Sequence, residues 1–162
     1  MPVRAAVLPI PPGLQATGTE GAAFAAVARL TEVPAGALLR VTRGDLDILI
    51  AHTAAGLAAI DDRCPHMSAP LSLGAMDGCV VDCPLHSGRF DLASGGTVRF
   101  PTTGGLDADG LYHPPWQPPD NPPRVEPTDA KARARAATRV RRLRYYPLRI
   151  RAGRIEIALP RP

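Results

Sequence analysis

The chain has 162 residues, which is the length of one domain with an extension and leaves no room for a second large domain. Apolar residues make up 45%, enough for a hydrophobic core, so the chain is not disordered throughout, while 15 glycines and 19 prolines argue against a long helical bundle. The net charge of +4 is uneven, because residues 101–162 carry twelve Lys and Arg against six acids.

The N-terminal segment is broken by Pro9, Pro11 and Pro12, so it contains neither a secretory signal nor the ~20 apolar residues that span a bilayer. Three cysteines, an odd number, do not suggest a disulfide framework. We therefore expect a cytoplasmic protein without a membrane anchor. Residues 1–24 are predicted to form an irregular N-terminal arm.

Short apolar stretches then recur between turn signals that contain glycine or proline. Strands of this length with frequent turns predict a sandwich or barrel rather than βαβ units. The predicted strands are residues 25–30, 37–42, 46–52, 56–60, 79–82 and 97–100.

Residues 101–142 interrupt this pattern. Eight prolines lie between residues 101 and 127, which favours extended or turn geometry. The Ala/Arg-rich residues 129–144 predict a marginal helix, capped by Thr128 or Asp129. Strands resume at residues 145–150 and 154–158, and Ala152-Gly153 between them predicts a hairpin.

Two short segments carry the chemistry: Cys64-Pro65-His66 and, after sixteen intervening residues, Cys83-Pro84-Leu85-His86. Each supplies one thiolate and one imidazole. Four such ligands can hold zinc, but zinc sites usually pair Cys with Cys and His with His at short spacing. The alternative is a [2Fe–2S] cluster with two Cys on one iron and two His on the other.

At these residues the sequence resembles the Rieske [2Fe–2S] ferredoxin family. The resemblance extends to Leu57–Arg63, Gly88–Gly96 and Tyr146–Ile157. It implies an all-β fold, a Rieske-type antiparallel β-sandwich with a small cluster-binding subdomain. The Rieske domain would cover residues 25–159, and a Pro-rich and Arg-rich insertion at 101–142 would precede the last hairpin.

The resemblance also implies a ligand set. Cys64 and Cys83 would bind the buried iron, and His66 and His86 the outer iron of a Rieske-type [2Fe–2S] cluster. Pro101 stands where the family has a third loop near the cluster, and the insertion grows from this edge.

Substitutions near these ligands indicate the low-potential, oxygenase-associated class. High-potential members of the resembled family have a disulfide where this chain has Ala69 and Leu85, so that disulfide cannot form here. They also have two hydroxyl donors where this chain has Gly88 and Phe90, which carry no hydroxyl. Ser87 stands where the family usually has glycine, and its hydroxyl allows a small upward correction of the potential.

We therefore expect a one-electron carrier that accepts electrons from a flavin-dependent reductase and passes them to a terminal oxygenase or similar acceptor. It is expected to be an electron-transfer component rather than a complete enzyme, because only His113 remains after residue 100 to ligate a catalytic iron. The alternatives are a redox or iron sensor, a small electron-transfer subunit of a larger oxidoreductase, and a structural zinc domain. The sequence defines no oligomeric state.

The Arg-rich stretch Lys131–Arg144 is either a solvated linker or a docking site for an acidic redox partner. Nucleic acid is not an expected partner, because the stretch lacks interleaved aromatic residues. Trp116 is expected to anchor the Pro-rich segment to the body, and the alternative is a contact with a partner protein. His52, Cys79 and His113 are expected to be structural.

Overall fold

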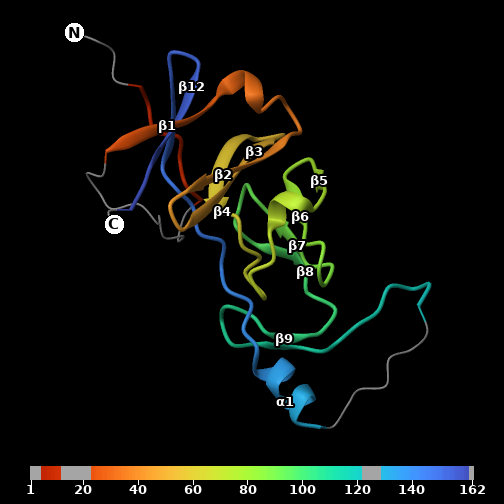
Figure 1. The fold of residues 1–162 in the computed structure, drawn as a ribbon. Coiled ribbons are helices and arrows are strands. Elements are labelled where there is room, and N and C mark those ends of the chain that lie inside the picture. Colours follow the sequence, from red (N-terminus) through yellow and green to blue (C-terminus); the bar gives the residue numbers. More distant parts are fainter. Residues whose placement is uncertain (1–4, 12–22, 122–128, 161–162) are drawn as a thin grey trace.

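The computed structural model describes residues 5–11, 23–121 and 129–160, and it consists of antiparallel sheets around two cores (Figure 1). One sheet has the order β2-β3-β4, a second β1-β12-β11 and a third β5-β6-β7-β8. The all-β prediction is confirmed. The strands of the first two sheets are β1 (Phe24–Arg29), β2 (Leu38–Arg43), β3 (Leu46–Thr53), β4 (Gly56–Asp61), β11 (Leu148–Arg151) and β12 (Arg154–Ala158).

The predicted C-terminal hairpin is present as β11 and β12. Its turn residues Ala152 and Gly153 both have positive φ, 48° and 70°, and Arg151 pairs with Arg154 across it. Such a two-residue turn matches the right-handed twist of the flanking strands. The first strand of the hairpin begins at Leu148 rather than at residue 145, because Pro147 has no N–H to donate to a ladder.

The strand β3 lies between the two cores. Its side chains alternate, so that Ile48 and Ile50 pack with β11 and β12 while Leu49 and Ala51 face the third sheet. These four side chains are fully buried, which explains why the segment reads as a nearly continuous apolar run. One strand therefore connects the two halves of the molecule.

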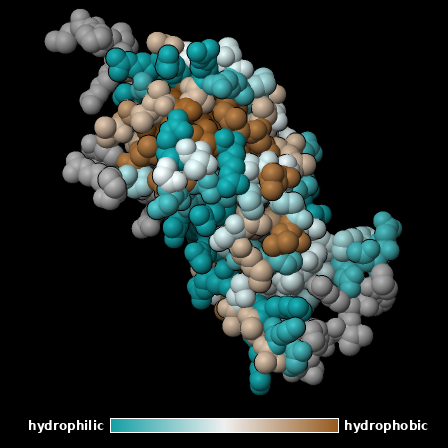
Figure 2. All heavy atoms as spheres, in the orientation of Figure 1, coloured by the Kyte–Doolittle hydropathy of each residue, from teal (hydrophilic) through white to brown (hydrophobic). Residues whose placement is uncertain are grey.

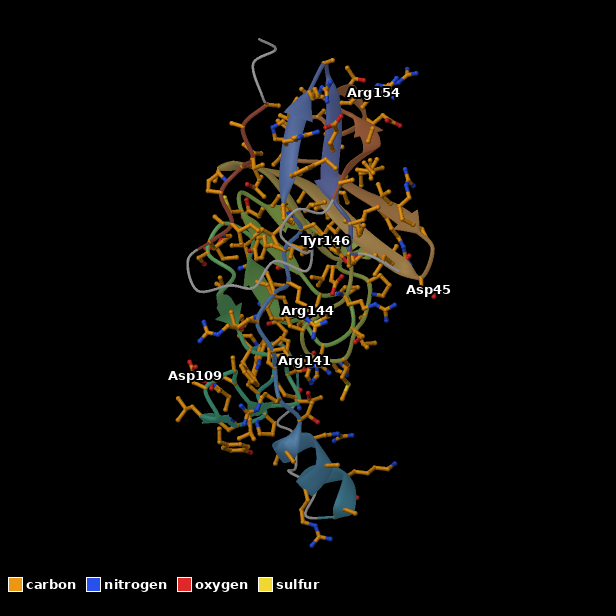
Figure 3. All side chains as sticks on the ribbon, turned by 90° about the vertical axis from the view of Figure 1, so that its left-hand side faces the viewer. Asp45, Asp109, Arg141, Arg144, Tyr146 and Arg154 are labelled. Carbon is orange, nitrogen blue, oxygen red and sulfur yellow. The ribbon has the colours of Figure 1, made fainter. Side chains whose placement is uncertain are left out.

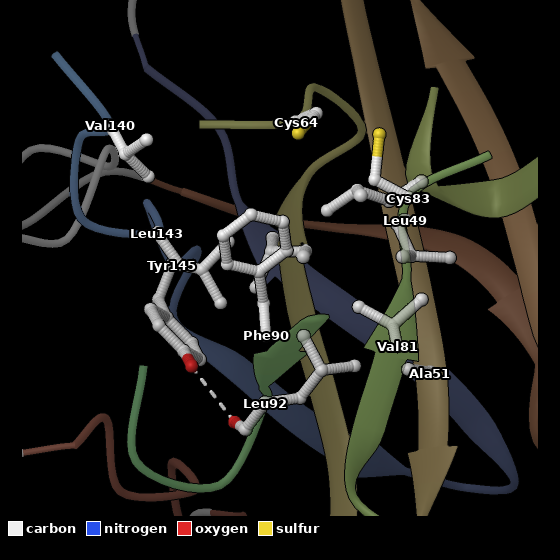
Figure 4. Close-up of a cluster of buried hydrophobic side chains, with 12 residues drawn as sticks. Leu49, Ala51, Cys64, Val81, Cys83, Phe90, Leu92, Val140, Leu143 and Tyr145 are labelled. Atoms are coloured by element: carbon white, nitrogen blue, oxygen red, sulfur yellow. Dashed lines mark hydrogen bonds between the residues drawn. The ribbon is translucent and has the colours of Figure 1, made fainter. Parts of the chain in front are cut away.

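The third sheet carries the Cys/His segments. It is formed by β5 (Met76–Asp77), β6 (Val80–Asp82), β7 (Arg89–Asp91) and β8 (Thr97–Arg99). Figure 4 shows its core, in which Cys64 and Cys83 lie at one end and Tyr145 donates a hydrogen bond of 2.8 Å to the Leu92 carbonyl at the other. Burial raises the pKa of the Tyr145 hydroxyl, so this bond keeps its proton.

A two-stranded ribbon and one helix follow the third sheet. The ribbon pairs β9 (Gly105–Leu106) with β10 (Tyr112–His113), and α1 (Ala130–Ala137) lies at the far end of the molecule (Figure 1). Gly105 has a φ of 132°, and a β-carbon there would stand 2.4 Å from the Thr138 carbonyl oxygen. Glycine therefore permits the close approach of the ribbon to the end of the helix.

The helix is shorter than predicted. Asp129 caps it as expected by accepting a hydrogen bond from the Ala132 N–H, but it ends at Ala137 instead of residue 144. From there the chain is extended, with Arg139 bridged to Leu106 and the Val140 and Leu143 side chains 1% and 4% exposed in the core. Tertiary burial of these two side chains overrides the helix propensity of the Ala/Arg-rich sequence, so residues 139–144 are not a solvated linker.

The predicted anchor Trp116 is confirmed. Its indole N–H donates a hydrogen bond of 2.7 Å to the Phe100 carbonyl, and the guanidinium of Arg99 lies 5.1 Å from the centre of its ring. His113 also has a structural role, since it stacks on Phe100 and its Nε2 lies 2.9 Å from an Asp107 oxygen. Pro122, Pro123 and Pro127 lie outside the described residues.

Figure 2 shows that hydrophobic side chains gather in the upper half of this face, over the sheet of β2, β3 and β4. The lower half, which holds the ribbon and α1, is mostly hydrophilic. Within the described part of the chain, the longest run of helix is too short and too polar to cross a bilayer.

Candidate metal centre

Two loops of matching construction present the Cys/His segments. The backbone N–H of Cys64 donates to the Ala69 carbonyl at 2.7 Å, and that of Cys83 donates to the Gly88 carbonyl at 2.8 Å. Each bond closes a loop of six residues that begins at the cysteine. The two cysteines therefore lie at equivalent positions of the two loops, whereas His66 is the third residue of its loop and His86 the fourth.

Each loop contains a serine in the left-handed region. Ser68 has a φ of 61° and Ser87 a φ of 58°, values at which a β-carbon is disfavoured. At Ser87 this conformation explains why glycine is usual at that position in the resembled family. The local turn of each loop imposes this conformation, so both serines occupy it despite their side chains.

The two cysteines form a buried pair. The Cys64 thiol donates a hydrogen bond to the Cys83 sulfur, which lowers the pKa of Cys83 to about 6 although burial opposes it. The same hydrogen bond, together with burial, raises the pKa of Cys64. Backbone N–H groups of the two loops also point at the sulfurs and lower both pKa values. The site therefore stabilises negative charge on sulfur, as a metal thiolate requires.

The two histidines form a second pair. The ring centroids of His66 and His86 are 4.9 Å apart and the rings are nearly perpendicular, at 80°. The Nδ1 atom of His66 is buried and makes no hydrogen bond within the described residues, and the Nδ1 atom of His86 is buried as well. Buried polar atoms normally have a partner, so an orphaned imidazole nitrogen is the mark of a ligand-binding position.

His66 is held in its neutral form. Burial lowers its pKa to about 4, and repulsion from His86 adds to the effect. Neutral imidazole is the form that binds a metal. On the other side of the ring, the Nε2 atom of His66 lies 3.2 Å from the Thr103 hydroxyl.

The four side chains form a sulfur pair and an imidazole pair. In the described ranges, no three His, Cys, Asp or Glu side chains are grouped as a single metal ion would need. A [2Fe–2S] cluster with mixed ligation needs two pairs, one on each iron. The donor set and its pairing fit such a cluster.

The segment after Phe100 covers both loops. The Thr102 N–H donates to the His86 carbonyl at 2.9 Å, and Thr103 contacts the side chain of His66. The sequence predicted that Pro101 lies near this site, but it gave no indication of the contact made by Thr103. A threonine that lies 37 residues from its histidine partner carries no spacing signal.

Further contacts brace the first loop from outside. The carboxylate of Asp62, nearly fully buried, accepts hydrogen bonds from the Ser72 N–H at 2.8 Å and the Ser72 hydroxyl at 2.5 Å. The Arg141 N–H donates to the Pro65 carbonyl at 3.0 Å. The loop is thus tied to η2 (Leu71–Leu73) on one side and to residues 139–144 on the other.

The second loop has an exposed tip and a buried base. Leu85 is 59% exposed at the tip. Phe90 is buried, and the Cζ atom of its ring lies close to Gly88. No hydroxyl is present on Gly88 or Phe90, the two positions singled out from the sequence. Cys79 is half-buried in the turn before β6, away from both loops.

Comparison with known families gives one match for this region. Residues 23–109, more than half of the chain, match the family model described as "Rieske [2Fe-2S] domain". The matched range includes both loops and Thr103.

Similar proteins have related names. The ferredoxin component of the naphthalene 1,2-dioxygenase system of Pseudomonas aeruginosa is 35% identical over 74 residues, which cover 46% of this chain and 71% of that protein. The 3-phenylpropionate/cinnamic acid dioxygenase ferredoxin subunit of Photorhabdus laumondii is 36% identical over 78 residues, 48% of this chain and 73% of that one.

Solved structures show the same fold. The Sphingomonas yanoikuyae B1 ferredoxin aligns with a TM-score of 0.56 at 19% identity, covering 85% of this chain and 100% of that chain. A chain of the complex of reduced oxygenase and oxidized ferredoxin in carbazole 1,9a-dioxygenase also aligns with a TM-score of 0.56 at 19% identity, covering 86% and 95% of the two chains.

Proposed function

Because the chain belongs to the Rieske [2Fe-2S] domain family, we propose that Cys64, His66, Cys83 and His86 hold its [2Fe–2S] cluster. Cys64 and Cys83 would bind the inner iron and the two histidines the outer iron. The observation that carries this assignment is the orphaned, buried Nδ1 atom of His66, beside a cysteine pair that already favours a thiolate. The four side chains perform no bond chemistry themselves.

The residues around the site fit one-electron transfer. When bound by Cys64, His66, Cys83 and His86, the cluster would supply one-electron redox chemistry. The backbone N–H groups of the loops donate to the cysteine sulfurs and offset their charge, while both histidines contribute neutral ligands. The absence of hydroxyls at Gly88 and Phe90 supports a potential at the lower end of the Rieske range.

We propose that the electron comes from a flavin-dependent reductase and leaves to a terminal oxygenase. The support for the oxygenase lies in the names of the relatives, which are ferredoxin components of dioxygenase systems. A ferredoxin–oxygenase complex is among the structures with the same fold. The exposed Leu85 at the tip of the second loop offers an apolar contact beside the cluster.

We also propose that the chain is organised as an irregular arm at residues 1–24 and a Rieske domain at residues 25–159, with an insertion at residues 101–142. A cytoplasmic location is proposed as well. None of the three cysteines is joined to another by a disulfide, as expected in a reducing compartment.

Anaerobic purification with iron, zinc and sulfide analysis, followed by EPR of the reduced protein, tests the assignment. We expect two irons and two sulfides per chain and a Rieske-type signal. Cys64→Ser, Cys83→Ser, His66→Gln or His86→Gln should abolish the signal, whereas the matched controls Cys79→Ser and His52→Gln should keep it. Colourless protein with bound zinc, or a signal that survives the four ligand substitutions, would contradict the proposal.

A further inference from the structure

Four exposed arginines lie on the outer side of the first metal loop. Arg63, Arg141, Arg142 and Arg144 line a shallow cavity of about 70 Å³ whose other walls include Cys64 and Pro65. Figure 3 shows Arg141 and Arg144 along the chain segment that runs between α1 and β11, with Arg154 at the opposite end of the molecule. We call Arg63, Arg141 and Arg144 the basic patch.

The backbone fixes the basic patch to the site. The Arg141 N–H donates to the Pro65 carbonyl at 3.0 Å, and the Arg144 carbonyl accepts a hydrogen bond from the Asp61 N–H at 3.0 Å. Between them, Leu143 is buried in the core. The patch therefore stands on a rigid segment, one hydrogen bond away from the residue between Cys64 and His66.

The basic patch keeps a net positive charge. The nearby Arg142 is engaged by Asp109 at 3.0 Å, but no ion pair joins Arg63, Arg141 or Arg144 to an acid in the described ranges. Asp61, which borders the same cavity and accepts a hydrogen bond of 2.5 Å from the Tyr146 hydroxyl, offsets one of the three positive charges at most. The surface beside the candidate cluster site is therefore positively charged.

We propose that the basic patch docks a carboxylate-rich face of the protein that exchanges electrons with this chain. The inference rests on the proposed function and adds the chemistry of the partner surface. A net positive surface next to a redox site attracts an acidic protein and orients it with its own cofactor toward the cluster. Met67 on the same loop is 46% exposed and supplies an apolar contact that suits a protein interface rather than a phosphate backbone.

The helix α1 is not part of this surface. Its basic side chains, Lys131, Arg133 and Arg135, lie on an element whose main contacts with the other helices and strands are with β9. The proposal therefore separates the Arg-rich stretch into two parts. Arg141 and Arg144 belong to the docking surface, and residues 130–137 do not.

Two variants with equal loss of charge test the proposal. One replaces the patch, Arg63→Gln/Arg141→Gln/Arg144→Gln, and the matched control replaces three other exposed arginines, Arg133→Gln/Arg151→Gln/Arg154→Gln. Each reduced holoprotein is oxidised in a stopped-flow instrument by anionic ferricyanide or by cationic hexaamminecobalt(III), at several ionic strengths. Poly-L-glutamate, as a carboxylate surface, and duplex DNA of equal total charge serve as competitors.

We expect the patch variant to react about tenfold more slowly with ferricyanide at low ionic strength and faster with hexaamminecobalt(III). The control variant should behave like the parent. Poly-L-glutamate should slow ferricyanide oxidation of the parent and the control but not of the patch variant. Equal rates for all three proteins, or equal effects of the two variants, would overturn the proposal.

Stronger competition by DNA than by poly-L-glutamate, lost in the patch variant, would also overturn it, in favour of a phosphate ligand. The visible spectrum before mixing reports the cluster independently. A missing spectrum would count against the proposed function, whereas an intact, reducible cluster with no dependence on the patch would count only against the docking surface.

Discussion

The Thr103 hydroxyl lies 3.2 Å from Nε2 of His66, and both residues are buried. This contact occupies one ring nitrogen and leaves the other, the buried Nδ1, without a hydrogen-bond partner among the described residues. The tautomer that binds metal through Nδ1 carries its proton on Nε2, so His66 donates and Thr103 accepts. A residue after the third sheet therefore sets the orientation of a proposed iron ligand.

Replacing Thr103 by valine should raise the reduction potential. A hydrogen bond from Nε2–H makes the imidazole a stronger electron donor and favours the oxidised state. A net contribution of about 1 kcal/mol corresponds to roughly 40 mV for a one-electron couple, which bounds the expected shift. Protein film voltammetry at one fixed pH measures it.

Thr103→Ser is the control, because it keeps the hydroxyl and should keep the potential within a few millivolts of the parent. A valine variant with the parent potential would show that Thr103 acts only in packing. Couplings from two coordinated nitrogens in pulsed EPR should persist in both variants. Their loss would show instead that the substitution displaced the ligand.

Phe90→Tyr should also raise the potential. The ring is buried and its Cζ atom lies close to Gly88 in the second loop. A hydroxyl on Cζ would therefore lie at the base of the metal site. A hydrogen bond to cluster sulfur stabilises the reduced state. Voltammetry of the single variant checks this, and an unchanged or lower potential would reject control by this position.

The cysteine pair predicts a distinctive titration in the cluster-free protein. Hydrogen bonding from Cys64 lowers the pKa of Cys83 to about 6, so thiolate absorbance at 240 nm should appear as the pH rises through about 6. It should be absent below that pH, where both thiols are protonated. The Cys79→Ala background removes the third thiol.

In that background, Cys64→Ala should move the transition up toward the pKa of an ordinary cysteine, because the hydrogen bond that stabilises the thiolate is gone. If the transition stays near pH 6 without Cys64, the loop N–H groups rather than the pair are responsible.

Leu143→Ala should destabilise the protein by about 2–4 kcal/mol, because it removes a buried side chain from the core beside Cys64 and Phe90. Urea unfolding of the holoprotein measures the change in free energy. Arg142→Ala, one residue away and exposed, is the control and should cost less than about 1 kcal/mol. A Leu143 variant as stable as the parent would contradict the packing of residues 139–144.

The sequence predicted the parts of this fold that depend on local pattern. The hairpin at residues 148–158 follows from alternating isoleucines around Ala152-Gly153, and the cap of α1 follows from Asp129 before an alanine-rich run. The candidate metal residues follow from unusual Cys/His spacing, which few other structures require.

What could not be predicted depends on contacts between distant segments. The end of α1 at Ala137 is decided by the burial of Val140 and Leu143 against residues about 50 to 90 positions earlier in the chain. The approach of Thr103 to His66 depends on the path of the chain after Pro101. Neither leaves a periodic or spacing signal in the sequence.

Because β3 contributes side chains to both cores, it also affects how the protein unfolds. Its odd and even side chains belong to opposite cores, so neither half can melt while this strand stays fully packed. Amide protons of Ile48–Ala51 should therefore be among the last to exchange with deuterium. A destabilising substitution in either core would therefore weaken the packing of the other core. The stability of the metal loops thus depends in part on the packing of β3 against β11 and β12.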